Sequence, residues 1–353
     1  MEHGNGDRLL RFASQTLDEG YQQVAAQALD IAAERLRDPE GADVVDLMRA
    51  KIAQSLGEFQ RSDSLLSVVA DDPASARVER SALMSRGLIR LQQLDRPLEA
   101  AQDFRVVRKM GWPENDRRLD YYEAIALIRT DSLDAAIIPL QREIPQENLD
   151  DASSFGFITE SGVVGDTDLN HLAARIMLWT GKREQASALL DSLLNPPVGA
   201  SAENETLLLL QLITTSQDSI ALDLFAEADY ARFRGDIPVA LTLLDSLALN
   251  ENTPEQLAVE ADYSAAMLHL TQSDSAGAIV EFANRHPEHP RVEEAWYQLG
   301  LWWEAKGNYS DAEIAYEMVL MDFPDGLLQS LARLRLEELT VQLFLPDLPA
   351  EDL

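Results

Sequence analysis

The chain has 353 residues, of which 46% are hydrophobic, so it can form two or three compact domains or one long repeat array with a buried core. Its 61 acidic and 29 basic residues give a net charge of −32, which argues against general nucleic-acid binding because phosphates would be repelled. The absence of cysteine excludes disulfides, thiol catalysis and cysteine-ligated metal sites. No run of about 18 apolar residues is present, so we expect no membrane span.

The first part of the chain is predicted to form four helix pairs, because apolar residues recur there at helical spacing between regularly placed turns. Gly20 and Gly57 mark the turns of the first two pairs, and Asp131 marks that of the fourth. In the second helix of the third pair, Ala100 is followed four residues later by Phe104, a small–large pattern that recurs along the chain. The four pairs are expected at residues 7–36, 43–69, 76–110 and 116–144, each followed by a proline-containing break.

The helical pattern fails between residues 146 and 167, where glycines, serines and phenylalanines alternate without a helical period. A loop of this length inside a repeat array is either a simple insertion or a functional segment that contacts a partner or covers a site. We therefore divide the chain into N-terminal repeats at 1–145, an irregular insertion at 146–167, C-terminal repeats with a capping helix at 168–345, and an acidic tail at 346–353.

Four further helix pairs are predicted after the insertion, at residues 168–194, 219–248, 254–285 and 293–324. An additional amphipathic helix is expected at 203–215, and a last helix at 327–344 has the place of the capping helix that a solenoid requires at its end. Two of the pairs repeat the same four letters at the same position of the second helix, Leu190-Asp191-Ser192-Leu193 and Leu244-Asp245-Ser246-Leu247.

The last pair has the most complete pattern. Its first helix contains Trp296, Leu299, Gly300 and Trp303, and Gly307 marks the turn. Its second helix contains Ala312 and Tyr316, and Pro324 ends the unit. This spacing resembles the tetratricopeptide (TPR) pattern W-x2-L-G-x2-Y, then A-x3-F, then P. The resemblance implies an all-α fold, a right-handed superhelical solenoid of about eight TPR-like helix pairs with a C-terminal capping helix.

The last two pairs carry a further resemblance. The segment from Phe282 to Pro287, the helix pair, and Phe323-Pro324 with the helix after it are similar to TPR proteins of the bacterial cell envelope. The coordinator of the Tol–Pal system and the lipoprotein of the outer-membrane barrel-assembly machine have this arrangement. The resemblance implies an adaptor in a bacterial envelope assembly, located in the periplasm or cell envelope, with the cytoplasm as the alternative.

Catalytic signatures are missing from the sequence. It has no glycine-rich phosphate loop, no H-E-x-x-H and no G-x-S-x-G motif, so we expect a non-catalytic protein without a cofactor. His286 and His289 flank Pro287 and could approach one metal ion together with Glu281 or Glu293. The alternative, which we favour, is a polar turn between two helices, and we predict no metal site.

A partner-binding groove follows from the TPR resemblance, because positions two, five, nine, twelve and thirteen of the first helix usually line the concave surface in that family. A groove with arginines and aromatic side chains would hold a protein or peptide partner. Alternatively, these arginines only pair with nearby carboxylates, or the same groove carries a small anion or a glycan under residues 146–167 as a lid. The oligomeric state is left open. The predicted groove residues are Arg118, Tyr121 and Arg129 in the fourth pair, His171, Arg175 and Trp179 in the fifth, Phe225, Arg232 and Phe233 in the sixth, and Tyr263, Met267, Tyr297 and Leu301 in the last two.

Overall fold

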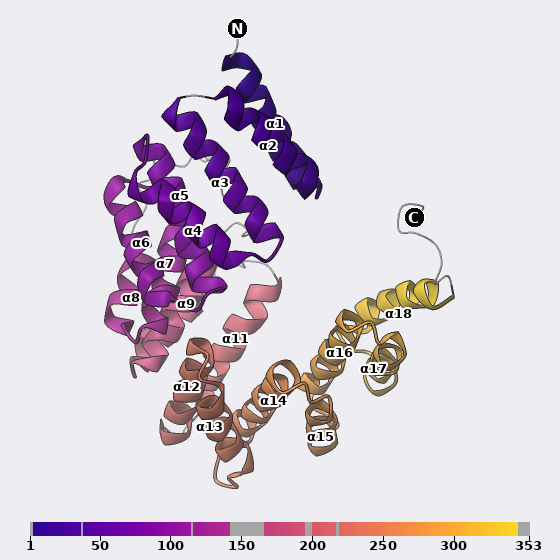
Figure 1. Ribbon diagram of the computed structural model, residues 1–353. Helices are drawn as coiled ribbons and strands as arrows, with labels where there is room; N and C mark the ends of the chain where they lie inside the picture. Colours follow the sequence, from indigo (N-terminus) through magenta and orange to yellow (C-terminus); the bar gives the residue numbers. More distant parts are fainter. Residues whose placement is uncertain are drawn as a thin grey trace. The chain divides into compact units, whose positions relative to one another are not determined.

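The computed structural model describes residues 3–36, 38–113, 116–141, 166–194, 200–216 and 219–344 (Figure 1). All regular structure in these ranges is α-helical, as the sequence predicts. The helices in chain order are α1 (His3–Asp18), α2 (Gln22–Arg35), α3 (Pro39–Ser55), α4 (Phe59–Asp71), α5 (Ala76–Gln92), α6 (Pro97–Met110), α7 (Arg118–Arg129), α8 (Leu133–Leu140), α9 (Asp166–Trp179), α10 (Arg183–Leu193), α11 (Ala200–Thr215), α12 (Ser219–Arg234), α13 (Ile237–Leu249), α14 (Glu255–Gln272), α15 (Gly277–Arg285), α16 (Pro290–Ala305), α17 (Tyr309–Asp322) and α18 (Gln329–Phe344).

The chain forms two compact units, Met1–Thr206 and Leu207–Leu353. In the first unit, helices α1 to α10 pack as five consecutive pairs, and in the second unit α12 to α17 pack as three pairs with α18 against the last one. The eight predicted helix pairs, the additional helix and the capping helix are therefore confirmed, with ends that differ by a few residues. Most of the predicted insertion, residues 146–165, lies outside the described residues, and the division into domains stays a prediction.

Each helix pair turns on one residue with a left-handed backbone. Five of these residues are glycines with φ between 71° and 86°, which adopt this conformation at little cost: Gly20, Gly57, Gly181, Gly235 and Gly307. The other three are Asp95, Asp131 and Asp274, with φ of 52° to 59°. Aspartate is tolerated at such positions because its short polar side chain can bond locally.

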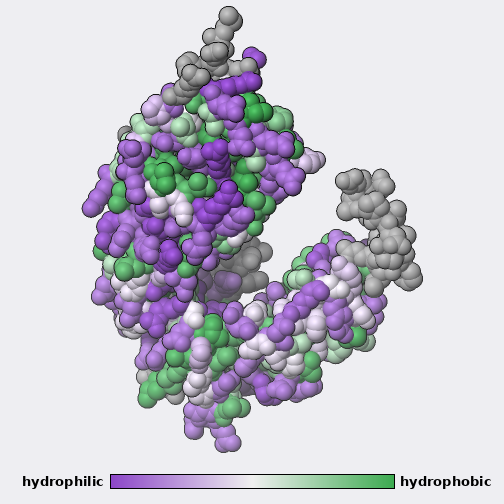
Figure 2. Space-filling model, viewed as in Figure 1, coloured by the Kyte–Doolittle hydropathy of each residue, from purple (hydrophilic) through white to green (hydrophobic). Residues whose placement is uncertain are grey.

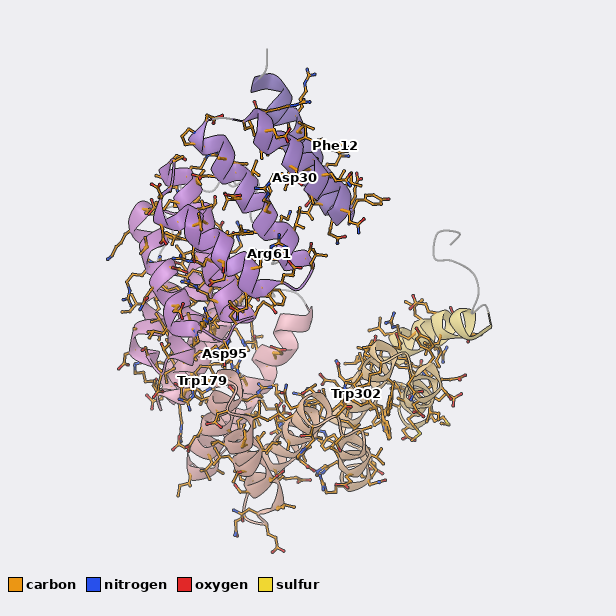
Figure 3. The ribbon with its side chains drawn as sticks, in the orientation of Figure 1. Phe12, Asp30, Arg61, Asp95, Trp179 and Trp302 are labelled. Carbon is orange, nitrogen blue, oxygen red and sulfur yellow. The ribbon has the colours of Figure 1, made fainter. Side chains whose placement is uncertain are left out.

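Two of these aspartates contact the next helix pair. Asp95 (Figure 3) accepts a 2.6 Å hydrogen bond from Arg129 at the end of α7. Asp274 forms an ion pair with Lys306 beyond α16. The Lys306 ammonium also lies 4.2 Å from the ring centre of Trp302. An aspartate at the left-handed turn thus links its helix pair to the next one through its carboxylate. A glycine at the same turn has no side chain and cannot form this link.

In the core of each pair, a large residue of the second helix packs against a small residue of the first helix, and we call this recurring arrangement the register. The large residue of the second helix is buried in every pair, with 0–3% exposure: Leu29, Leu66, Phe104, Leu140, Leu190, Leu244, Phe282 and Tyr316. The residue 16 or 17 positions earlier in the first helix is always alanine or glycine: Ala13, Ala50, Gly87, Ala124, Ala174, Ala228, Ala266 and Gly300.

The two glycines of this register face aromatic rings. A Cβ atom at Gly87 would lie 2.6 Å from the Phe104 ring, and one at Gly300 would overlap the ring of Tyr316. Glycine is therefore required at these two positions, where Phe104 and Tyr316 fill the space, whereas alanine suffices beside the leucines and beside Phe282. This steric rule at Gly300 explains the Leu299-Gly300 dipeptide of the last pair, which is part of the TPR pattern.

Buried ion pairs cross the helices of the first unit. Asp103 on α6 accepts from Arg86 at 2.7 and 3.0 Å and from Arg90 at 3.0 Å, and Arg90 reaches Asp63 on α4 at 2.7 Å. Asp120 on α7 has no exposed surface and lies 2.8 Å from Arg108 and 2.7 Å from Arg117. These pairs fix the relative positions of successive helices, since a buried charge without its partner is strongly unfavourable.

No helix within the described ranges is long and apolar enough to cross a lipid bilayer. Hydrophilic side chains cover most of the surface visible in Figure 2, and hydrophobic residues are exposed there in separate patches.

Candidate partner-binding face

The first helices of the first unit carry a cavity of about 660 Å³ that we call the N-terminal hollow. It lies over α1 and α3, with the turn before α3 and the start of α5 forming its remaining walls. A smaller depression over α3 and α5 shares Met48 with it. The residues that line the N-terminal hollow are Asp7, Leu10, Arg11, Ser14, Leu36, Asp38, Glu40, Gly41, Val44, Met48 and Arg77.

The N-terminal hollow has an apolar floor and a charged rim. Leu36, Val44 and Met48 are at most 7% exposed, so only small parts of their side chains reach the cavity. At the rim, Glu40 accepts hydrogen bonds from Arg77 at 2.9 Å and from Ser75 at 3.1 Å. These hydrogen bonds, that from Arg77 first, hold the pKa of Glu40 below its ordinary value, so this part of the rim is anionic at neutral pH.

Arg11 is a cation of this rim without an ion-pair partner among the described residues, and we call it uncommitted in this sense. Its Nε donates to the Asp7 carbonyl oxygen at 3.4 Å, and within the described residues its guanidinium has no carboxylate within ion-pair distance. Most other arginines of this acidic chain pair with aspartate or glutamate, such as Arg49 with Asp30 at 2.9 Å. Arg11 is therefore available to an anionic group of a ligand.

The predicted groove residues of the fourth and fifth pairs lie on neighbouring first helices, α7 and α9. Arg175 stacks over Trp179 with 5.1 Å between the guanidinium carbon and the ring centre, and both residues are partly exposed (Figure 3). Burial raises the pKa of Tyr121, the nearby Asp168 carboxylate raises it further, and Arg175 opposes this rise. These charges on α9 act on a tyrosine of α7, so Tyr121 and Arg175 are close in space. His171 is also partly exposed on α9.

The two predicted arginines of α7 are engaged within the protein. Arg118 binds Asp116 through two nitrogens, at 2.5 and 2.9 Å. Arg129 binds Asp95 at 2.6 Å and the Leu91 carbonyl oxygen at 2.7 Å. This is the alternative in which the arginines pair with groups of their own chain, so a ligand would have to compete for them. Their role in partner binding stays a prediction.

In the second unit, the predicted residues divide into buried and accessible ones. Phe225 and Tyr263 are only 8% and 9% exposed, and the Tyr263 ring lies 4.6 Å from the Arg291 guanidinium. Arg232 is exposed and pairs with Asp229 at 2.7 Å. Burial raises the pKa of Tyr263, so the hydroxyl stays protonated. The remaining four, Phe233, Met267, Tyr297 and Leu301, are partly exposed.

The two histidines of the candidate metal site have structural partners. His289 precedes α16 and its Nδ1 accepts a 3.2 Å hydrogen bond from the Arg291 backbone N–H, which caps the helix. His286 lies 2.8 Å from Asp262, which also binds Arg285. Within the described part of the chain, no group of three histidine, cysteine, aspartate or glutamate side chains could hold a metal ion.

The N-terminal hollow is the feature that the sequence reading missed. Asp7, Leu10 and Ser14 of α1 and Val44 of α3 stand at helix positions two, five and nine of their pairs, the positions assigned to the groove in later pairs. Applying the same positions to the first three pairs would have found it. The predicted lid at 146–167 lies almost entirely outside the described residues.

No protein-family model matches the chain, and no curated protein matches its sequence. Among solved structures, a tetratricopeptide repeat protein from Parabacteroides merdae is 10% identical and aligns over 96% of this chain and 99% of its own, with a TM-score of 0.42. The type IV pilus biogenesis factor PilW is 16% identical over 71% of this chain and 96% of its own, with a TM-score of 0.38. A Rap protein complexed with competence and sporulation factor is 12% identical over 97% of both chains, with a TM-score of 0.38.

Proposed function

From an all-α solenoid of tetratricopeptide-like helix pairs, we propose a non-catalytic scaffold that binds a protein or peptide partner on the first-helix face of its first unit. The N-terminal hollow is the observation that carries this proposal. Its volume of about 660 Å³ lies in the range of ligand sites, and its apolar floor under a charged rim suits one or two anchoring side chains.

The chemistry of the rim indicates how a bound segment would be oriented. Arg11 offers two free guanidinium nitrogens to a carboxylate of the partner. Asp7 and Asp38 line the same cavity and would attract a lysine or arginine of the partner. A segment with an apolar side chain between an acidic and a basic residue therefore fits best.

The cluster on α7 and α9 provides a second contact for a longer partner. Arg175 and Trp179 form a partly exposed cation–π pair, and arginine and tryptophan are frequent interface anchors. Tyr121 and His171 belong to the same cluster. The resemblance of the last two pairs to envelope proteins extends the proposal to an adaptor of a bacterial envelope assembly in the periplasm.

One alternative is supported by the same cavity. A hollow of this volume with an arginine that forms no ion pair also suits a small anion or a glycan, which would make the protein a carrier or sensor. A ligand of this class would raise the melting temperature in the absence of any protein partner.

The test uses a matched pair of charge reversals. Arg11→Glu places a carboxylate at the rim, whereas Arg35→Glu makes the same change on α2, at an exposed arginine outside the cavity lining. Affinity capture from the source organism, with quantitative mass spectrometry, should show partners retained by the wild type and by Arg35→Glu but lost from Arg11→Glu. Equal retention by both variants would overturn the assignment of the hollow. If the capture retains no specific protein and a small anion raises the melting temperature, the alternative is established.

A further inference from the structure

The last helix, α18, has the place of the first helix of a ninth pair. Glu293 at the start of α16 accepts hydrogen bonds from the backbone N–H groups of Leu327 and Leu328, at 3.2 and 2.7 Å. Farther along, Arg335 of α18 binds Glu304 of α16 at 2.8 Å. These contacts join residues 31 to 35 positions apart, which is one repeat length, so α18 continues the repeat.

One face of α18 is covered by the eighth pair. Ala332 and Leu339 are 0% and 2% exposed, and Leu328 and Leu336 are partly buried beside them. This face accounts for the capping role that the sequence predicts.

The outer side of α18 carries exposed leucines. Leu331 and Leu334 are 46% and 51% exposed and lie three residues apart on the helix, and Leu327, which is 87% exposed, lies in the turn just before it. We call these three leucines the terminal stripe. A cap that only protects the end of a solenoid would carry a polar outer face here.

The repeat register shows what the terminal stripe lacks. Leu334 lies 34 residues after Gly300, the position at which each of the eight pairs has a buried alanine or glycine beneath its second helix. In α18 this position is half-exposed, because no second helix follows in the described part of the chain. Leu334 thus lies where a second helix would pack, and Leu331 has the place of Tyr297, whose ring lies 5.6 Å from that of Tyr316 in the second helix of its pair.

Charge indicates what kind of helix fits. Residues 207–353 contain 26 aspartates and glutamates against seven lysines and arginines. Six of these seven cations already lie within 4 Å of a carboxylate of the same unit. The seventh cation, Arg333, is exposed on α18 beside the stripe, as are Glu337 and Glu338, so the excess of negative charge comes from the unit as a whole. A helix with basic flanks is therefore favoured over an acidic one.

We infer that the terminal stripe binds an amphipathic helix of a partner protein, with an apolar face set against Leu327, Leu331 and Leu334 and with lysines or arginines on its flanks. The helix would take the place of the second helix of a ninth pair. This site lies in the second unit and does not depend on the N-terminal hollow.

The experiment measures binding of two fluorescent 21-residue helical peptides to the full chain by anisotropy. Both peptides have leucines spaced by three and four residues; one has lysines on its flanks and the other has glutamates. The lysine peptide should bind about tenfold or more tightly, and its affinity should fall as salt is added. Equal binding of both peptides, or no binding of the lysine peptide, would overturn the inference.

Variants locate the site. Leu331→Ser with Leu334→Ser should weaken the lysine peptide at least about tenfold, since two leucines leave the interface. Leu249→Ser removes a 74% exposed leucine from α13 of the same unit and should leave binding unchanged. Equal losses in both variants would show binding to exposed leucines in general and refute the site. Arg11→Glu should not affect this peptide, so failure here is distinct from failure of the proposed function.

A second copy of the chain is the competing occupant. It would appear in sedimentation as a wild-type dimer that Leu331→Ser with Leu334→Ser converts to a monomer. That result, without binding of the lysine peptide, would replace the partner helix by self-association.

Discussion

The two units of this protein share one packing rule but present different surfaces. Residues 1–206 contain 35 acidic and 22 basic residues, and the first unit combines a hollow with an uncommitted arginine. Residues 207–353 contain 26 acidic and seven basic residues, and the second unit ends in an exposed row of leucines. The register of a small residue in the first helix against a large one in the second is common to both. Repetition therefore determines the fold of each unit, and the residues outside the register determine what each can bind.

The largest difference in stability should come from the buried charges of the first unit. Asp120→Ala leaves Arg108 and Arg117 without this carboxylate in the interior, and we expect a loss of about 3–5 kcal/mol in unfolding free energy. Denaturant unfolding measures the loss, and hydrogen exchange should assign it to the first unit. The control, Asp30→Ala, breaks a pair with Arg49 in which Asp30 is 73% exposed, and should cost less than about 1 kcal/mol. Similar losses in both variants would contradict the assignment.

A smaller loss is expected in the second unit from its glycine–aromatic contact. Gly300→Ala forces a Cβ against Tyr316, which is fully buried, and should destabilise by about 1–3 kcal/mol. Gly277→Ala is the control, because a Cβ there meets nothing within 4 Å. Calorimetry should find the control unchanged or slightly more stable. A combined Gly300→Ala and Tyr316→Leu variant reproduces the register of Ala174 and Leu190 and should recover part of the loss. An unchanged Gly300→Ala would refute the steric rule.

The aspartate turns separate backbone strain from charge. Asp95 has φ of 52° and an 80% exposed side chain that pairs with Arg129. Asp95→Gly relieves the left-handed strain and loses the ion pair, so its stability should stay within about 0.5 kcal/mol of wild type. Asp95→Ala loses the ion pair and keeps the strain, and should be about 1 kcal/mol less stable than Asp95→Gly. Thermal unfolding of the two variants measures this difference. Equal stabilities of Asp95→Gly and Asp95→Ala would mean that the backbone is not strained at this turn.

The smallest effect is a pH dependence at the rim of the hollow. The pKa of Glu40 is lowered in the folded protein, so its contribution to stability is present above its ordinary pKa of 4.5 and is lost as the pH falls through the lowered value. Glu40→Gln should therefore be less stable than wild type near neutral pH, and the difference should shrink below pH 4.5. A constant difference across that range, in denaturant titrations, would show that Arg77 and Ser75 do not stabilise the ionised form.

Much of the fold could be predicted because its register is local. Gly307, Ala312 and Tyr316 mark the turn and the contact of one pair, and residues of similar size recur at these positions in most other pairs. The turns at Asp95 and Asp274 were not identified, since aspartate is common in this chain and only the backbone shows its left-handed conformation.

The candidate site was harder to predict. Tyr263 and Tyr297 stand at the same helix position, yet Tyr263 is buried against Phe282 and beneath Arg291 whereas Tyr297 is partly exposed. The position of a residue within a helix predicts the direction in which its side chain points. It does not predict how exposed that side chain is, because exposure depends on the neighbouring side chains. The uncommitted state of Arg11 likewise depends on every carboxylate around it, and no spacing in the sequence reveals that.

The aspartate turns have a consequence for how the array comes apart. In a repeat protein, unfolding advances from one end pair by pair, and each step costs the interface with the next pair. Asp95 with Arg129 and Asp274 with Lys306 strengthen two of these interfaces, those between the third and fourth and between the seventh and eighth pairs. An advancing front of fraying therefore meets a slightly higher cost at these two boundaries than it would at a glycine turn.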